Sequence, residues 1–177
     1  MMYRRFPLAA LTAGLLLTLI SPLAAGPIPD PIVPGQLIVR LEPVADGLSA
    51  PNWGTFAPGL PARLLFVTDQ DGEIWEFDLQ TGASRIYLDV RARLVSLSPF
   101  QDERGLLGLA FHPEFTRNGR LYTYTSEPPG GNVDFPSVGA TPDHHAVITE
   151  WRVPQPANPF RVPDPASARV VLRIAEP

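Results

Sequence analysis

From residue 36 onward, the hydrophobic positions of this chain fall into short apolar runs separated by Gly, Pro, Asp and Asn. Such spacing is typical of β-strands joined by turns, and no segment keeps the 3.6-residue apolar period of a long helix. The clearest pair of strands is Arg63–Thr68 and Glu73–Asp78, because Asp71-Gly72 between them suits a tight hairpin turn. Trp75 and Phe77 share one side of the second strand, which predicts a strand with one buried face.

The stretch from Ser98 to Glu127 carries the most information. Within it, the glycine-punctuated apolar run Gly105–His112 is followed by a turn over Pro113–Gly119 and by a strand from Arg120 that alternates Tyr and Thr. This order predicts a strand–loop–strand unit of an all-β repeat protein.

An internal repeat links this unit to the earlier hairpin. Phe56 matches Phe111 at a distance of 55 residues, and Arg63 matches Arg120 at a distance of 57. The first copy consists of Trp53–Gly59, Arg63–Thr68 and Ile74–Phe77, and the second of Leu109–Pro113, Arg120–Thr125 and Ile148–Trp151. A period near 50 residues with about four strands per unit is typical of a β-propeller blade, so we predict a propeller. An ordinary β-sandwich with a chance similarity is the alternative.

Two later segments are rich in turn-forming residues. Pro128–His144 is an insertion that we expect to be a surface loop, and such loops often shape a binding face. Pro154–Pro165 is interrupted by prolines, and we expect an irregular connection there, followed by a last strand at Arg169–Ile174.

The first 35 residues are expected to lie outside the folded domain. A basic start, the apolar run Leu8–Ile20 and small residues up to Ala25 predict a signal peptide over 1–25 and export to the periplasm or the exterior. A membrane anchor is the alternative, but the run is short for a span, so we expect no stable membrane span after cleavage. Four prolines in 26–35 predict a tether, and 36–177 is the predicted domain.

The amino-acid composition excludes some classes of binding partner and of catalytic chemistry. The basic residues are 14 arginines with no lysine, against 18 acidic residues; without 1–25 the net charge becomes −6, because two arginines are lost. An acidic chain is not expected to bind nucleic acid. No cysteine is present, so the fold must hold without disulfides, and the absence of lysine excludes a Schiff base.

The histidines are the first candidates for chemistry. His112 precedes a proline at a strand end and is interpreted as a turn residue. Asp143-His144-His145 places an acid beside two imidazoles, a combination that can bind metal. Adjacent residues of a strand point to opposite faces and no third ligand is evident, so we predict no metal site.

Asp102-Glu103-Arg104 is a charged triplet directly before an apolar strand. One interpretation is a solvated loop with a local Glu103–Arg104 ion pair, which contributes little. The other is a polar side chain at the start of a blade, facing the central channel where propellers bind ligands. The residues alone favour neither.

Glu103–Phe115 together with Asn118-Gly119 resembles the GLLGLAFHPDF…NG motif of the glucose/sorbosone dehydrogenase family. These proteins are six-bladed β-propellers that use pyrroloquinoline quinone (PQQ). Leu48–Phe77, completed by Asp78–Gly82, resembles their first blade. The resemblance implies an all-β fold comprising about two blades of such a propeller. The hedgehog-interacting-protein group carries the same motif, so the motif marks the fold more surely than the activity.

The resemblance also assigns site residues. Glu103 occupies the position of a family glutamine that lies near the substrate, which implies a substrate-binding residue facing the channel. His112 matches the motif's histidine and is implied to be structural. The family's catalytic histidine lies in a segment after the strand equivalent to Val170–Ile174, so no catalytic residue is assigned here. Asp143-His144 imitates that segment but precedes the strand Val147–Arg152, and we do not assign it as the base.

The family oxidises a sugar or a related polyol with PQQ and calcium. The residues that bind both lie in later segments, so neither cofactor is expected to bind this chain alone. We therefore expect the N-terminal part of an exported PQQ-dependent sugar dehydrogenase-like protein, inactive by itself. The alternative is a non-enzymatic binding propeller that acts through the loop Pro128–His144. A third possibility is that two blades become self-sufficient through oligomerisation.

Overall fold

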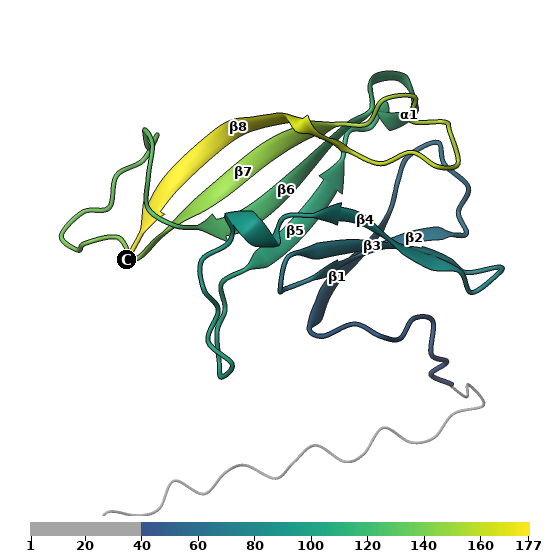
Figure 1. Ribbon diagram of the computed structural model, residues 1–177, viewed down its shortest axis with the longest axis horizontal. Helices are drawn as coiled ribbons and strands as arrows, with labels where there is room; N and C mark the ends of the chain where they lie inside the picture. The colour runs from purple at the N-terminus through teal and green to yellow at the C-terminus, as the bar shows by residue number, and fades with distance from the viewer. Residues whose placement is uncertain (1–39) are drawn as a thin grey trace, which may run out of the picture. The chain divides into compact units, whose positions relative to one another are not determined.

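Eight strands form two four-stranded antiparallel sheets, each with its strands in sequence order (Figure 1). The computed structural model describes residues 40–177; the predicted signal peptide, the tether and the start of the predicted domain at residue 36 lie outside the described residues. The first sheet contains β1 (Pro51–Phe56), β2 (Leu64–Asp69), β3 (Glu73–Asp78) and β4 (Ser84–Asp89). The second contains β5 (Leu106–Phe111), β6 (Arg120–Glu127), β7 (His144–Arg152) and β8 (Asp164–Glu176).

Helical structure in the described part of the chain is confined to two short turns. The 3₁₀ turn η1 (Arg91–Arg93) lies between the sheets, and α1 (Phe115–Asn118) lies between β5 and β6. Gly119 ends α1 with φ of 63°, and a Cβ there would lie 2.2 Å from the Val153 carbonyl oxygen, so glycine is needed. None of the helices in residues 40–177 is long and apolar enough to cross a membrane.

The two sheets are copies of one another in register. In the first, Phe56 pairs with Leu65 and Leu65 with Phe77; in the second, Phe111 pairs with Leu121 and Leu121 with Trp151. Both sheets have one register shift early in the first strand and one between the third and fourth strands, and the second sheet has a further shift between Glu150 and Arg152. The predicted repeat is confirmed.

The observed register corrects one detail of the sequence match. Because Leu65 is equivalent to Leu121, the second strands align at a distance of 56 residues, and the match of Arg63 with Arg120 was wrong by one residue. In the third and fourth strands, Glu76 is equivalent to Glu150 and Arg85 to Arg169, and each glutamate forms an ion pair with its arginine.

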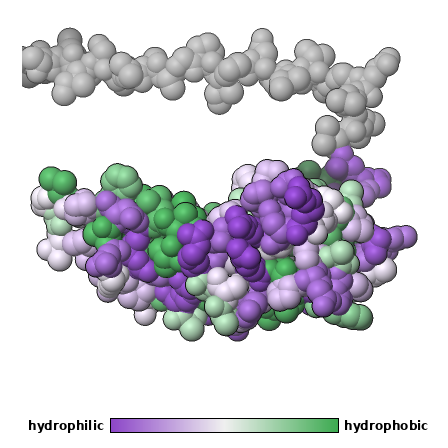
Figure 2. All heavy atoms as spheres, turned by 90° about the horizontal axis from the view of Figure 1, so that it is seen from above, coloured by the Kyte–Doolittle hydropathy of each residue, from purple (hydrophilic) through white to green (hydrophobic). Residues whose placement is uncertain are grey.

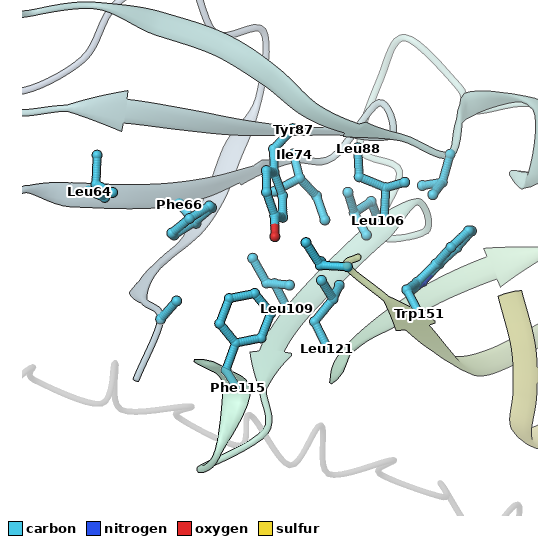
Figure 3. Close-up of a cluster of buried hydrophobic side chains, with 13 residues drawn as sticks. Leu64, Phe66, Ile74, Tyr87, Leu88, Leu106, Leu109, Phe115, Leu121 and Trp151 are labelled. Atoms are coloured by element: carbon cyan, nitrogen blue, oxygen red, sulfur yellow. The ribbon is translucent and has the colours of Figure 1, made fainter. Parts of the chain in front are cut away.

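The main core lies where the two sheets pack against each other. Figure 3 shows side chains of both sheets directed toward one another, among them Phe66 and Tyr87 from the first and Leu109 and Leu121 from the second. The ring of Phe66 meets those of Tyr87 and Phe111 edge-on, with both centroid distances at 4.8 Å. Burial of these apolar side chains is the main force that joins the sheets.

The prediction that the strand Glu73–Asp78 buries one face was wrong. Ile74 is completely buried by the second sheet, and Phe77 on the opposite face is also buried. Phe77 stacks with Trp75 at a centroid distance of 6.3 Å and lines a groove together with Pro43–Asp46. A strand inside a sheet is buried on both faces when each face has its own cover, which the alternation pattern does not reveal.

Two polar contacts also join the sheets. Arg93, in the connection after the first sheet, donates from Nε to Glu127 at 2.8 Å and lies 5.2 Å from the ring centroid of Trp151. The second contact runs from the second sheet to the first: Arg161, in the connection between β7 and β8, donates to Glu76 of β3 at 3.1 Å. Both carboxylates are buried, so each needs its cationic partner.

Candidate functional site

The loop before β5 is held in one conformation by the first sheet. The Gln70 side chain donates to the Asp102 carbonyl at 2.6 Å and to the Arg104 carbonyl at 2.8 Å, and the Gln70 backbone carbonyl accepts from Leu106 N–H at 2.9 Å. Gly105 has φ of 128°, and a Cβ at this position would lie 2.3 Å from the Gln70 carbonyl oxygen. The loop is therefore fixed by backbone contacts that only glycine permits.

The ion pair in the charged triplet is formed by Asp102 and Arg104. Their side chains make two hydrogen bonds of 2.9 Å, whereas the sequence interpretation had paired Glu103 with Arg104. The correction follows from the turn, in which Asp102 also accepts from the backbone N–H groups of Ser98 and Arg104. The Arg104 guanidinium, followed by these N–H groups, holds the pKa of the Asp102 carboxyl well below its usual range.

Glu103 is left exposed by this arrangement, at the rim of a polar hollow of about 410 Å³. The start of β5, the end of β6, the start of β7 and the end of β8 meet there, since antiparallel strands bring these ends to one edge of the sheet. We call this the polar hollow. Its polar lining consists of Glu103, Arg104, Tyr124, Ser126, Asp143, His144 and Glu176.

Asp143 and His144 also lie in the polar hollow, as a hydrogen-bonded pair. His144 Nδ1 is 2.5 Å from Asp143 Oδ1, and Arg104 Nη1 is 3.8 Å from Asp143 Oδ2. A carboxylate can only accept, so Nδ1 carries the hydrogen, and in the neutral imidazole Nε2 is then an acceptor. Sequence reasoning did not bring this pair together with Glu103; the signal that could have done so is the sequential antiparallel order of the sheet.

The other two histidines, His112 and His145, are held by contacts within the fold. His145 is buried, with Nδ1 3.5 Å from Arg173 Nη1, so the two adjacent histidines have different partners. His112 Nδ1 accepts from the backbone N–H of Glu114 at 3.0 Å and lies 2.8 Å from Asn118 Nδ2, within the turn that contains α1. Within residues 40–177, no three His, Asp or Glu side chains are grouped closely enough to hold a metal ion.

An apolar hollow of about 360 Å³ lies next to the polar one and shares Leu107 and Tyr124 with it. Trp53 from β1 and Ile148 from β7 line it, and Gly108 presents no side chain there. Aromatic surface beside a few polar groups is the usual composition of a small-molecule site. The two hollows together offer aromatic rings beside carboxylates and a hydroxyl group.

The charges of the polar hollow decide which ligands suit it. Glu103, Asp143 and Glu176 supply three carboxylates, while the only guanidinium in the lining, Arg104, is already paired with Asp102. A neutral ligand rich in hydroxyl groups suits this set, because carboxylates accept hydrogen bonds from hydroxyls. PQQ is a tricarboxylate, and the residues of the polar hollow do not fit it.

Comparisons with known proteins give two kinds of relative. No protein-family model matches the chain. Hedgehog-interacting protein from Homo sapiens is 34% identical over 141 residues, and that from Mus musculus is 41% identical over 141 residues. Each match covers 77% of this chain but only 18% of the relative. The chain thus spans less than a fifth of the length of the curated relatives it matches.

Dehydrogenases are among the solved structures that match the chain. A putative oxidoreductase (glucose dehydrogenase) from Thermus thermophilus is 26% identical with a TM-score of 0.52, over 76% of this chain and 31% of that one. The PQQ-bound aldose sugar dehydrogenase from Streptomyces coelicolor is 24% identical with a TM-score of 0.50, over 75% and 33%. The predicted fold class, a partial β-propeller, is confirmed over the part that the chain spans.

Proposed function

Because the chain has the fold of the glucose/sorbosone dehydrogenase family over the part that it spans, we propose that it supplies two blades of an exported, PQQ-dependent sugar dehydrogenase-like propeller. The polar hollow around Glu103 carries this proposal. Its carboxylates beside the aromatic surface of Trp53 and Tyr124 suit a sugar or a related polyol. The likeness to glucose dehydrogenase and aldose sugar dehydrogenase structures supports the same class of substrate.

The residues of the chain bind and orient substrate in this proposal. Glu103, fixed by the Gln70 contacts to its neighbours, accepts a hydrogen bond from one sugar hydroxyl. His144 Nε2, oriented by Asp143 at Nδ1, accepts from a second hydroxyl. Rings at the neighbouring apolar hollow cover the less polar side of the sugar. Two oriented hydroxyls fix the ligand in one pose, which is what a dehydrogenase needs before hydride transfer.

PQQ supplies the hydride acceptor when it is bound in a dehydrogenase of this kind, and no step of that chemistry is assigned to residues 40–177. We therefore propose that the 177-residue chain by itself binds sugar without oxidising it. Addition of PQQ and calcium to the isolated chain should leave an artificial electron acceptor unreduced. Turnover above that of free PQQ would contradict this part of the proposal.

Titration of the chain with glucose, monitored by calorimetry and by tryptophan fluorescence, tests binding at Glu103. Loss of a hydrogen bond to a charged group costs about 1.5–3 kcal/mol, so Glu103→Ala should weaken binding by about 10- to 100-fold. The matched control is Glu114→Ala, which truncates an exposed carboxylate outside both hollows. Unchanged glucose affinity in Glu103→Ala, or no binding by the unsubstituted chain at any aldose concentration, would overturn the proposal.

A binding propeller is the second candidate, and the identity to Hedgehog-interacting protein favours it. The loop Pro128–His144 is held against β8, where Asp134 N–H donates to the Arg173 carbonyl at 2.8 Å and Ala175 N–H to the Phe135 carbonyl at 2.9 Å. Phe135 and Val138 are exposed on this ordered loop. If sugars do not bind while Phe135→Asp abolishes capture of an exported protein, this candidate replaces the first.

A further inference from the structure

The connection between β7 and β8 reaches the first sheet and borders a hollow of about 320 Å³ there. The start of β2, the end of β3 and the start of β4 form the other side of this hollow, because antiparallel strands bring these ends to one edge of a sheet. We call it the arginine hollow, since Arg63, Arg85 and Arg161 line it. Arg85 Nη2 donates to the Arg161 carbonyl at 2.9 Å, so contacts within this chain join its two sides.

The arginine hollow carries one more positive charge than its carboxylates neutralise. Glu76 accepts from Arg85 at 3.0 Å and from Arg161 at 3.1 Å, and Asp78 accepts from Arg63 at 2.9 Å. Three guanidiniums therefore share two carboxylates. The balance is the reverse of that in the polar hollow, where three carboxylates meet one guanidinium. An excess of positive charge in a concave, partly enclosed site attracts an anion.

Hydrogen-bond donors of the arginine hollow are left for such an anion. The Arg161 side chain is 2% exposed, and its buried Nε has no hydrogen-bond partner within residues 40–177. Buried donors in native proteins almost always have a partner, because an unsatisfied one is costly. The Arg63 side chain is 47% exposed and gives only Nε to Asp78, so its other N–H groups are available to a second acceptor.

The remainder of the lining is mainly apolar. Leu64, Ala83, Pro159 and Phe160 contribute to it, and the Phe160 ring is 84% exposed. Figure 2 shows hydrophobic and hydrophilic side chains gathered in separate patches on one face of the molecule, whereas the arginine hollow combines both kinds in one lining. Apolar walls with a few convergent polar groups are typical of a small-molecule site.

We propose that the arginine hollow binds a small monocarboxylate with an apolar body, its carboxylate on the Arg63 and Arg161 guanidiniums and its body against Phe160. The single excess charge matches a monoanion. A carboxylate is planar and accepts two parallel hydrogen bonds from a guanidinium, which fits these donors. The arginine hollow shares no lining residue with the polar hollow, so this site is separate from the proposed sugar site.

Titration of the full chain with benzoate, monitored by calorimetry at low salt, tests the site. Benzamide is the matched probe, because it has the same ring and nearly the same size without the charge, and it should not bind. Arg63→Met removes a charged donor and should weaken benzoate binding by about 10-fold or more, with an unchanged circular dichroism spectrum. The control, Arg117→Met, removes an exposed arginine outside the hollow and should leave benzoate affinity unchanged.

Asp78→Asn gives a change in the opposite direction, which a loss of structure would not produce. The asparagine oxygen can still accept from the backbone N–H groups of Gln80 and Thr81, but the side chain no longer competes for Arg63 with a negative charge. Benzoate should therefore bind more tightly to this variant.

Three results would overturn the inference: no benzoate binding at about 10 mM, well above a millimolar Kd; equal binding of benzoate and benzamide; or weaker benzoate binding by Asp78→Asn. Glucose affinity at Glu103 should be the same in Arg63→Met as in the unsubstituted chain. Failure of the carboxylate site and failure of the proposed function are thus distinguishable.

Discussion

The two sheets have the same strand order and matching registers over their equivalent positions, yet these positions have different surroundings. Phe66 is completely buried, while its equivalent Tyr122 is only half-buried. Glu76 forms an ion pair with Arg161 from the connection between β7 and β8, while its equivalent Glu150 contacts Tyr122 and Arg169 of its own sheet. The sequence of each sheet determines how its own strands pair. The neighbouring sheet determines how far each face of the sheet is buried, and therefore how much that face contributes to stability.

The difference in burial between the two sheets also separates the stability that comes from strand pairing within a sheet from the stability that comes from contact between the sheets. Equivalent positions of the two sheets are paired in the same way, so strand pairing does not distinguish those positions. Residues distant in sequence cover the apolar side chains and the ion pairs of the first sheet, and this burial adds to its stability. Since burial stabilises by about 25 cal/mol per Å² of apolar surface, equivalent substitutions in the two sheets should have unequal effects.

The largest expected difference in stability is between substitutions of the equivalent aromatic residues Phe66 and Tyr122. Phe66→Ala leaves a cavity in the core between the sheets and should lower the free energy of unfolding by about 3–5 kcal/mol. Tyr122→Ala removes a half-buried ring and should cost about 1 kcal/mol. Urea unfolding of both variants measures the difference. Equal losses would mean that Phe66 and Tyr122 are equally well covered, contrary to the comparison.

The equivalent ion pairs should show a smaller difference. Arg161 is 2% exposed, so Arg161→Met leaves Glu76 buried with Arg85 as its remaining cation and should cost about 3 kcal/mol. Arg169 is 63% exposed, so Arg169→Met should cost less than about 1 kcal/mol. Adding Glu76→Met to Arg161→Met should restore most of the lost stability, because no buried carboxylate then remains, and the Arg85 guanidinium, whose side chain is 32% exposed, still donates to the backbone carbonyl of residue 161. If Arg161→Met and Arg169→Met are equal, the buried pair is not an interface contact.

Most of the fold could be predicted from the sequence because turn residues and apolar runs mark strands locally. Asp71-Gly72 located the first hairpin, and the likeness of Phe56 to Phe111 located the repeat. The strand Ser84–Asp89 was not predicted, since its few apolar residues are interrupted by charges. Two-sided burial of β3 and the one-residue shift at Arg63 depend on pairing between distant strands, which a linear pattern does not contain.

The site was only partly predictable for the same reason. Glu103 could be placed at the start of a blade because it immediately precedes an apolar strand. Its neighbours Asp143 and His144 come from the start of β7 and reach the same hollow only through sheet order. The actual partner of Arg104 depended on turn geometry, in which Asp102 rather than Glu103 faces the guanidinium.

The smallest expected effect concerns the loops that lead into the two sheets. It is a change in how the free energy of unfolding depends on pH. Asp69 holds the loop before β1 by accepting from Ser49 N–H at 2.6 Å and Ala50 N–H at 2.5 Å, while Asp102 holds the loop before β5. Folding lowers the pKa of Asp102, so the unfolded chain takes up this proton first as the pH falls. Its contribution to stability is therefore complete above the unfolded pKa of about 4 and is lost as the pH falls below it.

Asp102→Asn cannot titrate, so its free energy of unfolding should fall less than that of the unsubstituted chain between about pH 6 and pH 3. The difference should be below about 1 kcal/mol, because the ion pair lies in a partly exposed loop. Arg104→Met should reduce the pH dependence in the same way, since the guanidinium is the main cause of the lowered pKa. Arg117→Met, which breaks an exposed ion pair with Glu114, serves as the control and should not reduce it. If Asp102→Asn keeps the full acid sensitivity, the loop before β5 is held by the Gln70 contacts and Gly105 alone.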